Sequence, residues 1–315
     1  MTTVLVTGAN GFVGEHLCRY LPDRGYTVKA AVRDYLPDFE ASDQIVVGDI
    51  DGSTEWGKAL IGVDTVIHLA ARVHVMRESD ADPLSAFRRV NVDGSAALAQ
   101  QAAAAGVRRM IYLSTIKVNG EKTHGVPFRA DDAAAPEDAY GVSKWEAEQA
   151  LSDLAAKSGL EVVIIRPVVI YGAGVKGNIQ RLMSLVRRGV PLPLGGITNR
   201  RSFLSIQNLL DFLHCCIDHP AAAGELFLLA DGEDLSTPQL IRSLGKAMNR
   251  TDRLFPLPIS MLQLAGWLSG QSSAIARLTE DLQVDISKNR ERLGWTPLYD
   301  MDRALQEMVD MNSRR

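Results

Sequence analysis

The segment Val4-Leu5-Val6-Thr7-Gly8-Ala9-Asn10-Gly11-Phe12-Val13-Gly14 decides the fold of this chain. A short β-branched run leads into three glycines spaced three residues apart, and apolar residues at helical spacing follow. This pattern predicts a strand, a tight turn and a helix whose positive N-terminal end faces phosphates. The first glycine permits the sharp turn, the second lets backbone amides approach a pyrophosphate, and the third lets the helix pack on the strand.

Short apolar segments alternate with helical ones through the first half of the chain. Strands are predicted at residues 27–33, 44–47, 64–70, 109–114 and 161–166, and helices at 53–60, 83–105 and 137–157. Such alternation favours parallel pairing with right-handed crossovers. We therefore expect an α/β fold with a Rossmann-type doubly wound parallel sheet over residues 1–172.

The second half is richer in helical periodicity. Segments 237–244, 259–268, 274–282 and 301–309 are predicted as helices, while 206–217 and 225–229 read as a helix and a strand that return to the main sheet. We expect residues 173–200 and 232–315 to form a smaller, mainly helical substrate lobe, with return segments near 201–231 belonging to the dinucleotide-binding domain.

Composition excludes several classes of function. The chain has 315 residues, 46% hydrophobic and 23% charged, and a formal net charge of −4, which argues against a nucleic-acid surface. No apolar run is long enough to cross a bilayer and no leader precedes the first strand, so we expect a cytoplasmic protein without membrane contact. The three cysteines lack metal-ligand spacing, so no metal site is expected.

The motif Tyr140-Gly141-Val142-Ser143-Lys144 carries the chemistry. Residues four apart lie on one helix face, so the Tyr140 hydroxyl and the Lys144 ammonium can point into one pocket. A nearby cation stabilises a phenolate, which predicts a lowered tyrosine pKa and proton transfer by Tyr140. Thr115 follows a predicted strand where the cofactor would bind, and its hydroxyl can polarise a carbonyl.

Together these motifs resemble those of the extended short-chain dehydrogenase/reductases, in particular their nucleotide-sugar branch. The motifs that carry the resemblance are Thr7-Gly8-x-x-Gly11-x-x-Gly14, Gly48-Asp49-Ile50, His68-Leu69-Ala70-Ala71, Asn91-Val92-x-Gly94, Leu113-Ser114-Thr115, Tyr140-Gly141-x-Ser143-Lys144 and Arg166-Pro167 through Tyr171-Gly172. They occur in the family's order over roughly the first 175 residues.

The resemblance implies a role for each matching residue. Tyr140 would be the catalytic acid/base, Lys144 its pKa-lowering and ribose-binding partner, and Thr115 the catalytic hydroxyl. The implied cofactor-binding residues are Gly8, Asn10, Gly11, Phe12, Val13, Gly14, Arg33, Asp49, Ile50, Leu69, Ala70, Ala71, Asn91, Tyr140, Lys144 and Pro167. The implied substrate-binding residues are Ser114, Lys117, Asn178, Arg201 and Arg277. Asn91 and Ser114 also fit as caps or core polar groups.

Two regions depart from the family pattern. Arg201-Ser202-Phe203 stands where Arg-Asp-Phe is usual, and Lys117-Val118-Asn119-Gly120 replaces Val-Tyr-Gly beside the sugar. At the end of the second predicted strand, Val32 takes the place of the acidic residue that accepts hydrogen bonds from the ribose 2′-hydroxyl, and Arg33 follows it. Arg33 favours NADP, while Asp34 leaves NAD open.

The resemblance predicts hydride transfer at C4 of a UDP-hexose or UDP-HexNAc. Arg33 favours a UDP-4-keto-sugar 4-reductase of the kind that serves O-antigen synthesis, with a 4-epimerase that keeps NAD bound as the alternative. An alternative of another class is a dinucleotide-sensing regulator without turnover. The helices around Ala96 and Ala147 would pair across a homodimer, although they fit equally well as core helices.

Overall fold

The computed structural model describes residues 1–39, 43–73 and 82–314. Its centre is a seven-stranded sheet with the strand order β3-β2-β1-β4-β5-β6-β9, in which every neighbouring pair is parallel. The strands are β1 (Thr3–Thr7), β2 (Thr27–Val32), β3 (Gln44–Val46), β4 (Thr65–His68), β5 (Arg109–Leu113), β6 (Glu161–Pro167) and β9 (Leu226–Leu229). This confirms the predicted Rossmann-like doubly wound sheet.

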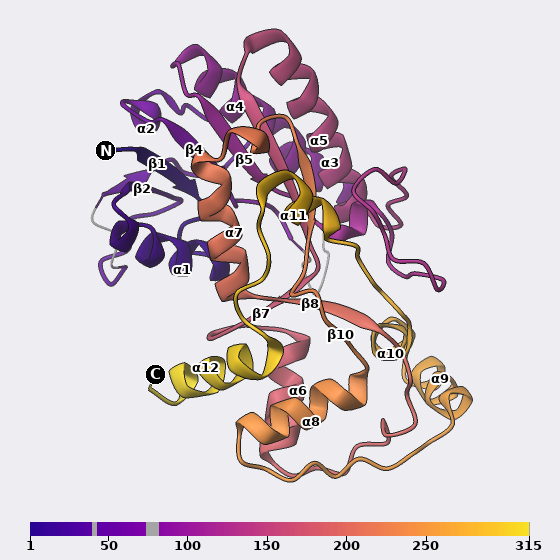
Figure 1. Cartoon of the computed structure of the whole chain (residues 1–315). Helices are drawn as coiled ribbons and strands as arrows, with labels where there is room; N and C mark the ends of the chain where they lie inside the picture. The colour runs from indigo at the N-terminus through magenta and orange to yellow at the C-terminus, as the bar shows by residue number, and fades with distance from the viewer. Residues whose placement is uncertain (40–42, 74–81, 315) are drawn as a thin grey trace.

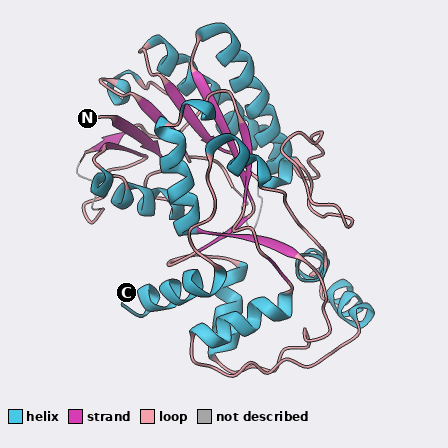
Figure 2. Cartoon of the chain, viewed as in Figure 1, coloured by secondary structure: helices cyan, strands magenta, loops and turns pink. Residues whose placement is uncertain are grey.

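Helices cover both faces of the sheet, as Figures 1 and 2 show. One face packs against α1 (Phe12–Tyr20), α7 (Ile206–Asp218) and α11 (Ser287–Leu293), and the other against α2 (Gly57–Leu60), α4 (Ser95–Ala104) and α5 (Ala139–Ser158). Apolar side chains at helical spacing on these elements supply two separate buried clusters. The short helices η1 (Pro22–Arg24), η3 (Ile116–Val118) and η4 (Pro220–Ala222) complete this part of the molecule.

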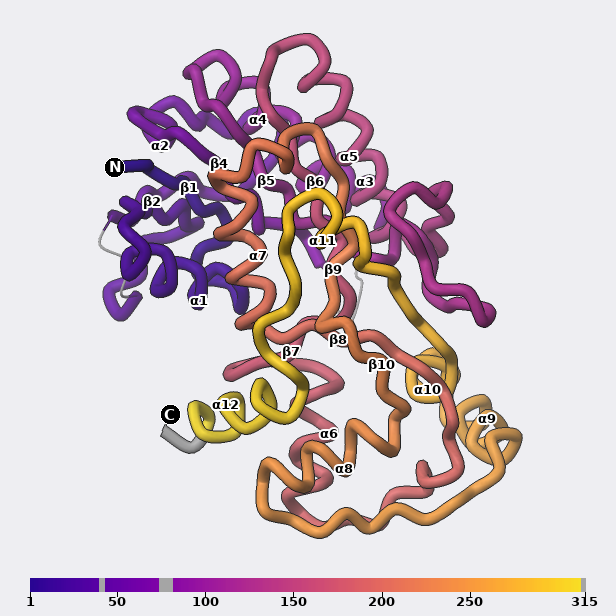
Figure 3. Tube along the Cα trace, in the orientation of Figure 1, coloured from indigo at the N-terminus to yellow at the C-terminus, as the bar shows by residue number. Residues whose placement is uncertain are grey.

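A smaller, mainly helical region lies beyond the carboxyl ends of the strands (Figure 1). It contains α6 (Asn178–Arg187), α8 (Thr237–Ala247), α9 (Ile259–Leu268), α10 (Ser272–Thr279) and α12 (Met301–Arg314). A three-stranded sheet of β10 (Asp234–Leu235), β8 (Arg201–Ser205) and β7 (Val169–Tyr171) lies between the two regions. The tube in Figure 3 shows the chain returning through α11 beside the main sheet before it ends in α12. A third apolar cluster fills this region.

Two predicted helices differ from the structure. Residues 83–105 do not form one helix, because the π-helix η2 (Arg89–Gly94) separates α3 (Pro83–Arg88) from α4. Gly94 lies there against Ile50, so closely that a Cβ atom would be 2.6 Å from the Ile50 side chain. The predicted helix at 53–60 is only one turn, α2, because the Thr54 side chain bonds to the loop backbone at Asp51 instead.

A buried carboxylate joins the two regions. Asp231, just after β9, accepts hydrogen bonds from the Tyr171 hydroxyl at 2.9 Å, from the Ser205 amide at 2.9 Å and from the Asn208 side chain at 2.7 Å. Asn208 in turn bonds to the backbone of Tyr299, just before α12. Within the described residues, no helix has the length and apolar character that a membrane span needs.

Candidate active site

A cavity of about 1200 Å³ lies at the carboxyl ends of the parallel strands, where ligands bind in such sheets. It runs from the glycine turn after β1 to the start of α5. Of the predicted cofactor and catalytic residues, it is lined by Gly8, Asn10, Gly11, Phe12, Val13, Gly14, Arg33, Asp49, Ile50, Leu69, Ala70, Ala71, Thr115, Tyr140, Lys144 and Pro167. The residues predicted to bind the cofactor and those predicted to be catalytic therefore line the same cavity.

The glycine turn has the geometry of a phosphate cradle. Gly8 has a φ of +63°, and a Cβ there would lie 2.8 Å from the Ala70 backbone nitrogen. Gly11 is the N-cap of α1 and provides no side-chain cap, so the first amides of the helix stay available to an anion. These features fit the pyrophosphate of a dinucleotide.

An ion pair lies in the part of the cavity lining that follows β2 and β3. β2 ends at the buried Val32, and the Nε atom of the next residue, Arg33, lies 2.8 Å from Oδ1 of Asp49. Both side chains are largely exposed. The cation that favoured NADP in the sequence is therefore paired with a carboxylate, whose charge would repel a 2′-phosphate.

Helix α5 presents Tyr140 and Lys144 to the cavity. Asp138 caps the helix, because its carboxylate accepts a 2.7 Å bond from the Gly141 amide. The Lys144 Nζ atom donates to the Leu113 carbonyl at 2.7 Å and lies 4.0 Å from the centre of the Tyr112 ring. Lys144 is therefore fixed beneath the end of β5, one helical turn from Tyr140.

The prediction of a lowered Tyr140 pKa is wrong. Burial, together with the nearby Asp138 charge, raises the pKa of Tyr140 to about 12. Burial lowers the pKa of Lys144 to about 7, and the charge of Glu148 acts in the opposite direction. Sequence spacing indicated the neighbouring cation but gave no measure of desolvation, which is the larger effect here.

Three predicted residues around the cavity make contacts within the protein. Thr115 begins η3, and its side-chain oxygen accepts from the Lys117 amide at 3.3 Å. The Ser114 hydroxyl donates to the Glu148 carboxylate. Asn91 lies in the π-helix outside the cavity lining, and its side chain bonds to the Arg72 backbone and to Ser143. These bonds join Asn91 in the π-helix to Ser143 in α5.

The other predicted substrate residues lie outside the cavity lining. Lys117 Nζ is 2.7 Å from Glu121 and 2.6 Å from Asp138. Asn178 is exposed at the start of α6. The side chain of Arg201 in β8 is buried and donates to the Glu280 carbonyl at 3.0 Å.

Arg201 and Arg277 lie close enough to interact electrostatically. Burial lowers the pKa of Arg201, the charge of Glu280 acts in the opposite direction, and the positive charge of the exposed Arg277 in α10 lowers it. Two guanidinium groups held near each other favour an anion between or beside them. Glu280, whose carbonyl accepts from Arg201, also acts on it through its negative charge.

Sequence reasoning missed a buried ionic network behind the cavity. Glu148 and Arg166 pair at 2.5 Å, and Asn119 accepts from Arg166 at 2.8 Å. The available signal was the spacing of Tyr140, Lys144 and Glu148, which are four residues apart and so share a helix face. A charged residue on that buried face required a partner, but the sequence did not indicate which one.

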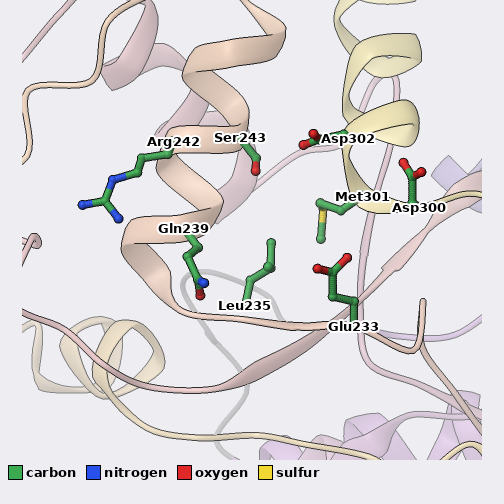
Figure 4. A pocket seen from close by; sticks show the side chains of 8 residues that line it. All are labelled: Glu233, Leu235, Gln239, Arg242, Ser243, Asp300, Met301 and Asp302. Atoms are coloured by element: carbon green, nitrogen blue, oxygen red, sulfur yellow. The ribbon is translucent and has the colours of Figure 1, made fainter.

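A second, smaller cavity of about 460 Å³ lies between α8 and α12 (Figure 4). It shares no lining residue with the larger cavity. Its lining residues are Glu233, Leu235, Gln239, Arg242, Ser243, Asp300, Met301 and Asp302. Asp302 is paired with Lys246 at 2.5 Å. The predicted chemistry therefore belongs to the larger cavity.

Comparison with known proteins agrees with the fold and the glycine turn. Residues 4–230 match the model of the NAD dependent epimerase/dehydratase family. The chain belongs to this family and is an enzyme of the short-chain dehydrogenase/reductase class, in its nucleotide-sugar branch. The resemblance inferred from the motifs is confirmed.

Three known proteins illustrate the similarity. A UDP-glucose 4-epimerase from Vibrio cholerae is 48% identical over 300 residues, covering 94% of this chain and 90% of that protein. MoeE5, solved in complex with UDP-glucuronic acid and NAD, is 25% identical with a TM-score of 0.79, covering 99% of each chain. The UDP-N-acetylglucosamine 4-epimerase from Bacillus cereus has the same fold, with a TM-score of 0.82 at 21% identity over 99% of this chain and 100% of that chain.

Proposed function

We propose that this protein is a 4-epimerase of a UDP-linked hexose or N-acetylhexosamine that works with bound NAD. One observation carries the proposal: a single cavity contains the glycine turn at one end and Thr115, Tyr140 and Lys144 at the other. Such a cavity can hold a dinucleotide along the strand ends, with a sugar beside the Tyr140 hydroxyl.

The choice of epimerase over 4-reductase rests on the relatives and on the cofactor end of the cavity. The Vibrio cholerae relative is called a 4-epimerase. In the sequence, Arg33 favours an exchangeable NADPH and so a reductase, while Asp34 leaves NAD open. Because Arg33 is paired with Asp49, that argument is weaker, and MoeE5 supports NAD through its complex. We therefore propose NAD as the cofactor.

The residues of the chain divide the work of the reaction. NAD, which the glycine turn at Gly8 and Gly11 would hold in the cavity, would supply reversible hydride transfer at either face of C4. Tyr140 takes the proton of the 4-hydroxyl and later gives it back, and Thr115 supports the same oxygen by hydrogen bonding. General acid–base catalysis of this kind contributes roughly 10² to 10⁴ in rate. Lys144, one turn away, provides the positive charge that favours the phenolate.

The diphosphate of the substrate needs cations on the other side of the sugar. Arg201 in β8 and Arg277 in α10 are the cations that the resemblance assigns to this role, and Ser202 stands where the family usually has an acidic residue. We propose that these arginines bind the UDP diphosphate, with Asn178 at the start of α6 near the nucleotide.

One experiment separates the candidate functions. Purified protein is incubated with UDP-glucose or UDP-N-acetylglucosamine without added cofactor, and the product configuration at C4 is determined by NMR. A 4-epimerase yields the galacto epimer under these conditions. A 4-reductase yields no product here and instead oxidises NADPH with a UDP-4-keto sugar, and a regulator does neither.

The predicted homodimer remains a proposal. The side chain of Ala147 is buried in the core of the single chain, so it cannot contact a second copy directly. Light scattering of the purified protein measures the mass in solution and tests this proposal, as twice the mass of 34.3 kDa is expected.

A further inference from the structure

A buried ion pair lies on the same helix face as the predicted catalytic residues. Tyr140, Lys144 and Glu148 follow one another at intervals of one helical turn along α5. Glu148 is 1% exposed, and both of its oxygens accept bonds from Arg166 of β6, at 2.5 to 3.2 Å. The pair therefore lies beneath the cavity, where no solvent screens it.

Further hydrogen bonds connect this pair to the elements that position the reaction. The Ser114 hydroxyl donates to Glu148 from the residue immediately before Thr115. Arg166 also donates to Asn119, just after η3, at 2.8 Å. The carboxylate of Glu148 is thus fixed by the end of β5 and by β6 at once, and Lys144 is bonded to Leu113 on that same end of β5.

A buried ion pair is a poor way to gain stability. Desolvation of two charges offsets most of their attraction, and apolar side chains of similar volume often stabilise a core as well or better. Stability alone therefore does not explain why the Glu148 carboxylate is buried. The nearby charge on its own helix is Lys144, which is itself fully enclosed.

The protonation of Lys144 depends on the groups around it, and among these the negative charge is that of Glu148. From β4 it faces His68, whose pKa burial lowers to about 3, so that the ring is neutral. From β5 it faces the Tyr112 ring, and on α5 it has Tyr140 on one side and Glu148 on the other. Glu148 is the group whose charge opposes the desolvation of the Lys144 ammonium.

We propose that Glu148 is a positioning residue of the reaction, held by Ser114 and Arg166 so that its negative charge stabilises the ammonium form of Lys144. This inference rests on the proposed function, in which that ammonium supports the Tyr140 phenolate. When Lys144 loses its proton, the phenolate loses its partner and turnover falls. Glu148 therefore sets the alkaline limit of activity, although it touches neither sugar nor dinucleotide.

The test is the pH profile of turnover for Glu148→Gln, which keeps an oxygen for Ser114 and removes the charge. The expected result is an alkaline limb displaced to lower pH, so that, relative to the natural protein, activity falls at least about five-fold more at pH 8 than at pH 5.5, on either side of the Lys144 pKa. Glu146→Gln is the matched control, because Glu146 is on the same helix but pairs with Arg88 at the surface. Its profile should be unchanged.

Two further measurements separate positioning from folding. The NAD content and the thermal midpoint of each variant are determined, and Glu148→Gln is combined with Arg166→Gln so that no unpaired charge stays buried. The double variant should regain the thermal midpoint while its alkaline limb stays displaced. A pH-independent loss of turnover in the folded variants would overturn the inference. Activity that survives Tyr140→Phe would instead overturn the proposed function. The effect of Glu148 on Lys144 would still be tested by the pH profile of Glu148→Gln.

Discussion

Gly14 packs so closely against Gly8 that a Cβ atom on Gly14 would lie 2.2 Å from the Gly8 carbonyl oxygen. The same atom would lie 2.7 Å from the backbone of Ala9, so neither neighbour is a flexible side chain that can move aside. The close contact brings α1 onto the turn and directs its N-terminus to the cavity. Fold and cofactor binding therefore depend on the same glycine.

Gly14→Ala should abolish the retention of NAD and lower the free energy of unfolding by at least about 2 kcal/mol, because the helix must move away from the turn. The measurements are the NAD released on denaturing the purified protein and a chemical unfolding curve. Gly57→Ala is the control, since a Cβ at Gly57 meets no atom within 4 Å. A Gly14→Ala protein that retains NAD at the natural level would contradict the cradle described here.

Asp49→Asn should shift cofactor preference toward NADP by about ten-fold, because Arg33 would lose its carboxylate partner and could pair with a 2′-phosphate. Binding of NAD and NADP to protein stripped of cofactor, followed by fluorescence, gives the ratio of the two dissociation constants. Arg33→Ala in the same background should remove the gain. An unchanged ratio in Asp49→Asn would show that the ion pair plays no part in cofactor selection.

Asp138→Asn should move the rising limb of the pH–rate profile to lower pH. The charge of Asp138 raises the pKa of Tyr140, so its removal lowers that pKa and the phenolate forms at lower pH. Asparagine still caps α5, which preserves the helix start. Because pH 6.5 and pH 9 both lie well below the pKa of Tyr140, turnover should rise by about three-fold at each of them. Glu121→Gln removes the other carboxylate bonded to Lys117 and serves as the comparison.

Asp231→Ala should destabilise the protein by about 3 kcal/mol, because it leaves the buried donors of Tyr171, Ser205 and Asn208 without their acceptor. Thermal unfolding measures the loss. Tyr171→Phe removes a single bond to the same carboxylate and should cost only about 1 kcal/mol. Equal losses in the two variants would indicate that Asp231 does not act as a shared acceptor.

The sequence predicted the architecture well because glycine spacing and strand periodicity are local signals. The order of strands and helices and the strand at 225–229 followed from them. It could not predict the π-helix at Arg89–Gly94, where Gly94 lies against Ile50, a residue distant in the sequence. The three-residue strand β7 directly follows the strand that Pro167 ends, and is too short to show periodicity.

The candidate site was predictable in its residues more than in its electrostatics. Helix spacing predicts that Tyr140 and Lys144 share one pocket, and the family resemblance implies their roles, but the direction of the Tyr140 pKa depends on how deeply the fold buries it. The pairing of Arg33 with Asp49 joins two strand ends that are distant in sequence. Glu148 pairs with Arg166 because the fold packs α5 against β6, which the sequence does not show.

The most direct test of the proposed function compares the natural protein with Tyr140→Phe on UDP-glucose and UDP-N-acetylglucosamine, without added cofactor. The variant loses one oxygen from a buried ring, so its fold and bound NAD should be retained and can be verified by absorbance. We predict conversion to the galacto epimer by the natural protein and a loss of at least about 100-fold in the variant. Equal rates of conversion in the two proteins would contradict the assignment of Tyr140 as the acid/base.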